Sequence, residues 1–380
     1  MTLESFLDKK PLFYEIIDYD RFPNIYEKIE HHFELPKIVH IVGTNAKGST
    51  GRALAHLLHV KGLHVGHYSS PHIMKFNERI WIDGDDIDDE FLESTHKQLQ
   101  SILSKKDIEA LSYFEYTTLL AMLVFCEKCD YIILEAGLGG EFDATNVFKK
   151  ELSIVTPIGY DHQSFLGSTI DDIASTKLRS VTGKLLLAKQ YEQEVYELAS
   201  ERVKVVRGDL YLAESFMDDE FYIDLKKWTK EKDYPLFFND NFSTAFCAYE
   251  FLGFKADLNL LNNLKLFGRC QKISTNITID VGHNPMAAFA LLEYFREKKV
   301  ILVYNSYNDK EYSKILEILK PIIKEVQIFK IENEREVLRK NLEEVLNSLD
   351  IKYSLFKKIK KDEEYLVFGS FSVVERFLCQ

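Results

Sequence analysis

The hydrophobic positions along the chain switch between two spacings, which predicts alternating strands and helices. Residues 37–43, KIVHIVG, form a short β-branched apolar run that ends in glycine, as a buried parallel strand should. Apolar residues then recur on one helical face as far as Gly62, where a helix is expected to end. The same alternation continues with strand 64–69, helices through 91–102 and 114–125, and strands 131–137 and 152–159. This order predicts a mostly parallel sheet with helices on both faces.

The alternation weakens in the middle of the chain and resumes after Asn276. In the irregular stretch, from about 190 to 262, residues 226–235, KKWTKEKDYP, are interpreted as a loop or a β-hairpin. The later predicted elements are strand 275–282, a helix after Pro285, strand 300–304, a helix after Asp309, strand 326–331, helix 335–349 and strand 364–370. We therefore expect an α/β protein with an N-terminal domain, residues 1–264, and a smaller, Rossmann-like C-terminal domain, residues 265–380.

Composition narrows the class of protein. With 46% hydrophobic and 28% charged residues, the chain lies in the range of soluble globular proteins. Its net charge of -12 disfavours nonspecific binding to nucleic acid or to an anionic membrane. The N-terminus lacks the pattern of a signal peptide, and no apolar run reaches about 18 residues. Five cysteines is an odd number, and the closest pair, Cys126 and Cys129, is interpreted as reduced core thiols, so we expect a cytoplasmic protein.

The first segment with chemical character follows the strand that ends at Gly43. It reads GTNAKGST, residues 43–50, and leads into the predicted helix. Free backbone amides and the positive end of a helix meet at such a junction, which suits phosphates. Lys47 adds a full positive charge, and Ser49 or Thr50 adds a hydroxyl near Mg²⁺. The segment departs from the usual GxxxxGK[ST] pattern, but strand, loop and helix together predict a nucleotide site rather than an ordinary turn.

Three further segments place polar residues after predicted strands. They are YSSPHIMKFNERI (68–80), ILEAGLGGEFDATNVF (133–148) and IGYDHQSFLGSTIDDIASTK (158–177). Glu135 stands at the carboxyl end of a strand, where open α/β sheets place ligands, and an oxygen ligand followed by GLGG is hard to explain as packing. Taken alone, Ser70 would be interpreted as part of a turn, His162 as a loop hydrogen bond, and Lys177 as a solvated charge.

In this order, the motifs resemble those of the folylpolyglutamate synthase/dihydrofolate synthase family of the Mur ligase superfamily. The four segments are similar to the family's GTNGKGS/T, SSPH…ERI, LExGLGGRxDATN and DHxxxLGxTxxxIAxEK. In the predicted second domain, FGRC (267–270) and IDVGHNPMAA (279–288) are similar to PGR and DxAHNP. NDKE (308–311) and FGSF (368–371) are similar to the family's HDKD and GS segments. The resemblance extends from about residue 18 to about residue 376.

The resemblance implies a site for each reactant. It implies that ATP is bound by Thr44, Asn45, Ala46, Lys47, Gly48, Ser49, Asn241, Arg269 and Asp280, with Arg269 on phosphate and Asp280 on ribose. It implies two Mg²⁺ ions whose ligands come from Ser70, Glu135, His162 and a carbamylated Lys177. The pterin-bearing substrate would lie against Ser112, Tyr113, Phe114, Glu115 and Asp143. The catalytic residues would be Lys47, His162, Lys177 and His283, with His283 and Asn284 near the glutamate and phosphate side.

The resemblance also implies an activity. The chain would be an ATP-dependent ligase that joins L-glutamate to dihydropteroate, a reduced folate or both through an acyl phosphate, acting as a cytoplasmic monomer without nucleic-acid or membrane partners. One alternative is a Mur-type ligase that adds an amino acid to a UDP-linked acceptor. A second is a P-loop regulatory NTPase. A catalytically dead homologue is disfavoured because the proposed phosphate and metal residues are present.

The chain departs from the family pattern at four places. Ala46 replaces a glycine, Glu141 replaces an arginine, residues 178–181 read LRSV where the family has AGI, and Phe267 replaces a proline. Ala46 is harmless if its φ is negative and costly if its φ is positive. Glu141 reverses a charge beside the expected pterin site, so it puts substrate preference, more than catalysis, in doubt.

Overall fold

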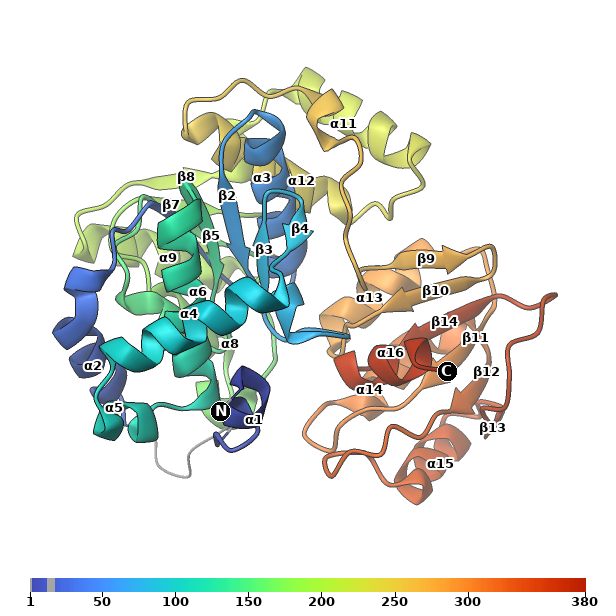
Figure 1. The fold of residues 1–380 in the computed structure, drawn as a ribbon. Coiled ribbons are helices and arrows are strands. Elements are labelled where there is room, and N and C mark those ends of the chain that lie inside the picture. The colour runs from blue at the N-terminus through green and yellow to red at the C-terminus, as the bar shows by residue number, and fades with distance from the viewer. Residues whose placement is uncertain (1, 12–17) are drawn as a thin grey trace. The chain divides into compact units, whose positions relative to one another are not determined.

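The computed structural model of the chain describes residues 2–11 and 18–380 (Figure 1). The chain divides into two compact units. The first unit contains Met1–Ile158, Ser164–Leu225 and Asp240–Leu264, and the second contains Gly159–Gln163, Lys226–Asn239 and Lys265–Gln380. Among the described residues, no helix combines the length and the apolar character that crossing a membrane requires.

The first unit is built on an eight-stranded sheet in the order β4-β3-β2-β5-β1-β6-β7-β8. Its strands are β1 Lys37–Val42, β2 Val65–Tyr68, β3 Ile80–Ile82, β4 Asp85–Asp86, β5 Tyr131–Glu135, β6 Leu152–Val155, β7 Leu185–Leu187 and β8 Leu210–Leu212. In the order of the sheet, all neighbouring strands from β2 through β5, β1, β6 and β7 to β8 pair in parallel. Strands β3 and β4 continue the sheet beyond β2 and pair antiparallel. The carboxyl ends of β2, β5, β1 and β6 therefore meet at one edge of the sheet.

Helices cover this sheet because their apolar faces pack against it. The helices before residue 264 are, in chain order, α1 Leu3–Leu7, α2 Arg21–Ile29, α3 Lys47–Val60, α4 Asp89–Ile102, α5 Lys105–Ala110, α6 Tyr113–Lys128, α7 Gln163–Leu166, α8 Ile170–Leu178, α9 Gln193–Val205, α10 Ala213–Phe216, α11 Asp219–Glu231 and α12 Phe238–Phe251. Helix α11 is divided after Leu225, and its remainder belongs to the second unit. Helix α6 is apolar on all sides and is buried from Tyr116 to Phe125. It belongs to a core cluster that includes residues of β2 and β5, whereas residues of α8 and α9 form a second cluster with β6 and β7.

The second unit is a six-stranded sheet in the order β13-β12-β11-β14-β10-β9. Its strands are β9 Gln271–Ser274, β10 Ile277–Asp280, β11 Val300–Tyr304, β12 Ile323–Ile328, β13 Tyr353–Leu355 and β14 Tyr365–Phe368. Its helices are α13 Pro285–Tyr294, α14 Tyr312–Leu319, α15 Arg339–Ser348 and α16 Phe371–Leu378. All strand pairs are parallel except β9 with β10. The carboxyl end of β10 carries Asp280.

The α/β class and the mostly parallel sheets predicted from the sequence are confirmed. The interpretation of residues 226–235 as a loop or hairpin is wrong for its first part, because α11 continues through Glu231. Leu225 and Thr229 are buried one helical turn apart, while Lys226, Lys227 and Lys230 are exposed. Only two buried positions in this segment follow helical spacing, and the many lysines around them make that pattern hard to recognise in the sequence.

The structure decides the question about Ala46, which is the N-cap of α3. Its φ is 67° and its ψ is -4°, so an alanine occupies the left-handed region that favours glycine. We expect Ala46→Gly to raise the free energy of unfolding by about 1 kcal/mol, because it removes the Cβ strain. Urea denaturation measures the change. Ala53→Gly inside the same helix is the matched control and should destabilise the protein; equal destabilisation by both variants would contradict the left-handed assignment.

Candidate active site at the carboxyl edge of the first sheet

The loop after β1 is held open by the end of the neighbouring strand. The backbone amides of Thr44 and Asn45 both donate to the carbonyl of Pro157, at 3.0 and 3.2 Å. Gly43 has a φ of +153°, and a Cβ there would come within 2.0 Å of the Thr156 hydroxyl oxygen, so only glycine fits. The first turn of α3 follows directly. A helix that begins directly after a strand and a glycine-containing loop is the arrangement that binds phosphates.

Side chains of this loop hold it in place through hydrogen bonds. Lys47 Nζ donates to the carbonyls of Gly43 and Thr44, at 3.0 and 3.3 Å. The Ser49 hydroxyl donates to the Ala46 carbonyl and accepts from Asn241 Nδ2 at 2.9 Å. Asn241 comes from α12, far along the chain, so the structure brings this predicted ATP residue to the loop.

Ser70 and Glu135 follow adjacent parallel strands. The register pairs Tyr68 of β2 with Leu134 of β5, so both residues stand at the same edge of the sheet. Glu135 is buried, and its Oε1 lies 2.5 Å from Nε2 of His67, a residue that the motifs did not single out. A Cβ on Gly51 would lie 2.7 Å from His67 Nε2 and 3.3 Å from Glu135 Oε1. The carboxylate therefore packs directly against the first turns of α3.

This set of side chains suits Mg²⁺. The ion prefers oxygen ligands and is usually held by one or two carboxylates together with substrate phosphates. Glu135 supplies a buried carboxylate and Ser70 a half-buried hydroxyl. In addition, the buried Thr50 hydroxyl has no hydrogen-bond partner within the part of the chain that the structure describes. A buried polar group of this kind calls for a bound ion, water or ligand.

Lys177 is the point where three motifs meet. It lies in α8, is buried, and its Nζ donates to the Gly43 carbonyl at 3.0 Å. A Cβ on Gly140 would come within 2.8 Å of the Lys177 carbonyl oxygen, and the Glu141 amide donates to the Thr176 carbonyl at 3.0 Å. The loop after β5, helix α8 and the phosphate loop are thus packed together.

Two of the departures from the family pattern turn out to be partners. The side chain of Glu141 accepts a short hydrogen bond from Arg179 Nε and forms an ion pair with it. Arg179 belongs to the unusual LRSV segment. The negative charge introduced at 141 is therefore offset by a positive charge introduced at 179, so the two substitutions do not leave a net charge beside the loop.

Asp143 organises the loop that contains it. Its Oδ2 accepts from the amides of Gly137 and Leu138, both at 2.9 Å. Its Oδ1 accepts from the amide of Thr145 at 3.0 Å and from the hydroxyl of Thr145 at 2.6 Å. Four donors fill the acceptor positions of a carboxylate, so the structure gives Asp143 a role in shaping the GLGG turn. Its contact with a pterin-bearing substrate stays a prediction.

The residues predicted beside Asp143 begin helix α6. Ser112 and Glu115 form a capping box, in which the Glu115 amide donates to the Ser112 hydroxyl and the Ser112 amide donates to the Glu115 carboxylate. Glu115 also pairs with Arg21 at 2.8 Å. The Phe114 ring lies against Gly137, where a Cβ would approach it to 2.7 Å. The half-buried Tyr113 ring faces the Arg79 guanidinium at 5.3 Å.

In the second unit, the predicted nucleotide residues gather at the end of β10. Asp280 is buried and accepts from the amides of Gly282 and Cys270, at 2.7 and 2.8 Å. Burial raises the pKa of Asp280, although these hydrogen bonds and the charge of Arg269 act in the opposite direction. The Arg269 guanidinium lies 5.3 Å from the centre of the Phe371 ring.

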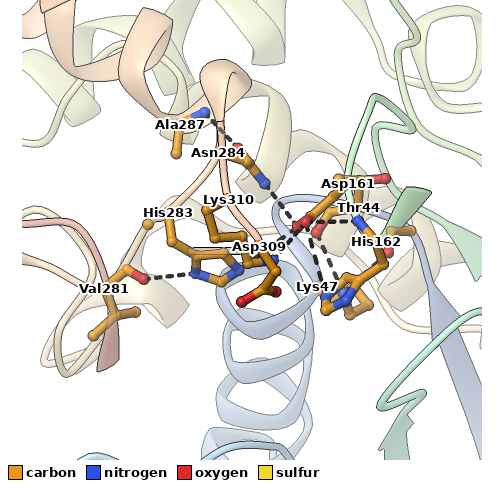
Figure 2. A network of polar contacts seen from close by, with 12 residues as sticks. Thr44, Lys47, Asp161, His162, Val281, His283, Asn284, Ala287, Asp309 and Lys310 are labelled. Atoms are coloured by element: carbon orange, nitrogen blue, oxygen red, sulfur yellow. Dashed lines mark hydrogen bonds and ion pairs between the residues drawn. The ribbon is translucent and has the colours of Figure 1, made fainter. Parts of the chain in front are cut away.

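A second polar cluster of this unit surrounds Asp161 (Figure 2). Lys310 Nζ lies 2.6 Å from its Oδ1, while His283 Nε2 and Asn284 Nδ2 approach its Oδ2 at 3.6 and 3.3 Å. Burial by itself would raise the pKa of Asp161, but the hydrogen bond from His283 and the nearby positive groups bring it well below its ordinary value. Asp161, His162 and His283 also place possible ligand atoms within 4.8 Å of one another. The sequence motifs assigned no role to Asp161 or Lys310.

The predicted metal ligands are divided between the two units. Ser70, Glu135 and Lys177 belong to the first unit, and His162 belongs to the second. Within the first unit, the three residues share the carboxyl edge of the sheet with the phosphate loop. His162 adopts a positive φ of 53° directly after Asp161.

Comparison with known proteins adds the family. No protein-family model matches the chain. A dihydrofolate synthase/folylpolyglutamate synthase of Haemophilus influenzae is 30% identical over 420 residues, covering 98% of this chain and 95% of the relative. The chain belongs to the dihydrofolate synthase/folylpolyglutamate synthase family. The recognition made from the ordered motifs is therefore confirmed, and so is the class of ATP-dependent ligase.

Solved structures of this family agree with the fold. A folylpolyglutamate synthetase of Helicobacter pylori is 38% identical, with a TM-score of 0.79 and coverage of 99% of this chain and 97% of that chain. A bifunctional folylpolyglutamate synthase/dihydrofolate synthase with Mn, AMPPNP and L-glutamate bound is 24% identical, with a TM-score of 0.83 and coverage of 100% and 98%. The family fold thus extends over both units of the chain.

Proposed function

We propose that the chain joins L-glutamate to the carboxylate of dihydropteroate and of reduced folates, with ATP as the energy source. The observation that carries the proposal is the packing of the phosphate loop, the GLGG loop and helix α8 at Lys177, in a chain related to such synthases over nearly its full length. We further propose that residues 1–264 act as the ATP-binding domain and residues 265–380 as the glutamate-binding domain.

The proposed reaction has two steps. A carboxylate oxygen of the acceptor attacks the γ-phosphorus of ATP, and the bond from that phosphorus to the β,γ-bridging oxygen breaks. ADP departs, and the acceptor is now an acyl phosphate. The amine of glutamate then attacks the acyl carbon, the carbon–oxygen bond to phosphate breaks, and the amine loses a proton. Because both reactants are anionic, the site has to neutralise phosphate charge.

The residues of the chain have separate tasks in this scheme. The amides of the phosphate loop, the Lys47 ammonium and Arg269 bind the phosphates, Asp280 binds the ribose, and Asn241 contacts the rest of the nucleotide. Two Mg²⁺ ions, held by Ser70, Glu135, His162 and carbamylated Lys177, would supply further neutralisation of phosphate charge when bound. His283 and Asn284 are placed on the side of glutamate and phosphate.

Carbamylation of Lys177 is part of the proposal. The neutral amine attacks carbon dioxide, a nitrogen–carbon bond forms, and a proton is released, which turns a cation into an anionic oxygen ligand. Lys177 is buried, so it is not a solvated surface lysine. The position of Lys177 in α8, beside the phosphate loop, supports a role at the phosphates over that of a solvated charge.

The pterin-bearing acceptor is favoured over a UDP-linked one by the segment 137–146. Its glycines, the ring of Phe114 against Gly137, and the Asp143-centred turn form a compact loop at the sheet edge. The pairing of Glu141 with Arg179 offsets the reversed charge that put substrate preference in doubt.

Release of ADP by the purified protein tests the proposal. With glutamate present, dihydropteroate, a reduced folate monoglutamate and a UDP-linked muramoyl acceptor are offered in turn. Dihydropteroate and the folate should each stimulate release, and omission of glutamate should reduce it. Stimulation only by the UDP-linked acceptor would replace the folate proposal with the Mur-type alternative. ATP turnover that ignores every acceptor and glutamate would indicate a regulatory NTPase.

We also propose that the enzyme acts in the cytoplasm as a monomer. All five cysteines are free thiols, in keeping with a reducing compartment. Size-exclusion chromatography with light scattering tests the monomeric state.

A further inference from the structure

His67 forms a buried pair with Glu135, one of the proposed metal ligands. His67 lies on β2 and Glu135 on the adjacent parallel strand β5, 68 residues later. The distance from His67 Nε2 to Glu135 Oε1 is 2.5 Å, and both side chains are almost completely shielded from solvent. Burying such a polar pair costs desolvation energy that an apolar pair would not, so packing alone does not explain it.

The surroundings hold the pair in one place. Helix α3 passes over it at Gly51, where any Cβ would collide with His67 Nε2 at 2.7 Å and crowd Glu135 Oε1 at 3.3 Å. Glu135 is the last residue of strand β5, so the sheet fixes its backbone. The position of the carboxylate group is thus set by two strands, one helix and one short hydrogen bond.

A carboxylate needs this kind of support to act as a metal ligand. The last torsion of a glutamate side chain is broad, so rotation of the carboxylate plane is cheap unless a hydrogen bond prevents it. In metal sites, such partners orient the ligand and are often worth about 10–100-fold in metal affinity or activity. A donor on Oε1 fixes the plane in which the carboxylate presents its oxygens.

We propose that His67 is a positioning residue, which holds the Glu135 carboxylate in the orientation that binds Mg²⁺ beside the phosphate loop. This inference rests on the proposed function, because it takes Glu135 as a metal ligand. His67 touches neither nucleotide nor acceptor in the proposal and acts only through Glu135.

The test measures binding of Mn²⁺, as a spectroscopic substitute for Mg²⁺, to the full chain in the presence of a non-hydrolysable ATP analogue. Electron paramagnetic resonance reports the free ion. His67→Leu should weaken Mn²⁺ binding by about 10–100-fold. His67→Gln should recover much of this loss because its amide nitrogen falls near the position of Nε2, whereas the shorter His67→Asn should not.

Two further variants make the outcome decisive. His96 is an equally buried histidine of the first unit, which bonds Tyr116 at 2.8 Å, so His96→Leu controls for the loss of a buried histidine and should leave Mn²⁺ affinity unchanged. Glu135→Gln should weaken Mn²⁺ binding whatever His67 does. If Glu135→Gln binds Mn²⁺ like the wild type, the proposed metal site itself fails. If it weakens binding but His67→Leu does not, the pair is structural and only the positioning role is overturned.

Thermal unfolding of the same variants shows whether His67→Leu folds as stably as the wild type. If it does not, its Mn²⁺ affinity is set aside. The comparison of His67→Gln with His67→Asn then decides, because both bury an amide at the same position and differ by one methylene. Equal Mn²⁺ affinities in these two variants would overturn the proposal.

Discussion

Lys177→Ala is expected to lower the rate of glutamate-dependent ADP release by about 10²–10³-fold or more, the cost of removing one group that stabilises transition-state charge. The residue is buried and lies against the phosphate loop, so its substitution acts where charge develops. If the working form is a carbamate, the missing group is an anionic oxygen ligand. Acetate or other short carboxylates should then restore part of the rate, which is measured as ADP release against carboxylate concentration.

Two comparisons separate the carbamate from the simple ammonium. Lys177→Arg keeps a positive charge that could bond the Gly43 carbonyl but offers no amine to carbon dioxide, so it should be as inactive as the alanine variant. Lys150 is a half-buried lysine of the first unit, with its pKa lowered to about 8 by desolvation. Any loss of rate in Lys150→Ala should not respond to carboxylates. Substantial turnover by Lys177→Arg would rule out the carbamate.

The parts of the fold that the sequence predicted are those whose signal is local. Strands β1 and β5 are buried on both faces, so each appears as a continuous apolar run. Strand β9 lies at an edge of its sheet and is largely exposed, so it has no such run. Only its pairing with β10 identifies it as a strand. Helix α11 was misread for the related reason that its buried residues are few and its lysines many.

The residues of the candidate site likewise fall into those that a local motif indicates and those that only the fold brings together. Lys47 and Glu135 stand in contiguous motifs whose residue types and spacing predicted them, and Lys177 was predicted from the resemblance of its motif to the family's. His67, Asp161 and Lys310 acquire a meaning only through partners far along the chain: 68 residues separate His67 from Glu135, and 149 separate Asp161 from Lys310. A lone histidine in a strand or a lone lysine in a loop carries no signal of such a partner.

The pairing of Glu141 with Arg179 shows what this means for departures from a family pattern. Considered alone, Glu141 looked like a reversal of charge beside the expected pterin site. Their side chains are 38 residues apart in sequence and bonded in space. A departure can therefore be judged only after its neighbours are known, because a second substitution can pair with the first and offset its charge.

Lys47→Met is expected to lower kcat/KM for ATP by about 10²–10³-fold, because the ammonium would no longer neutralise the transferred phosphate. In the structure Lys47 bonds the carbonyls of Gly43 and Thr44, so phosphate has to replace these contacts when nucleotide binds. Lys61, exposed at the opposite end of α3, supplies the matched control, and Lys61→Met should leave the kinetics unchanged.

The contacts of Lys47 also allow a purely structural role, and stability separates the two. If the ammonium serves only to brace the loop, Lys47→Met should lower the melting temperature while the remaining folded enzyme turns over ATP at its normal rate. If it serves the phosphates, the loss should appear in kcat at saturating ATP, with little change in melting temperature, because the Gly43 carbonyl keeps its bond from Lys177 and the Thr44 carbonyl belongs to a half-buried residue. A normal kcat in Lys47→Met would therefore exclude a catalytic role for this lysine.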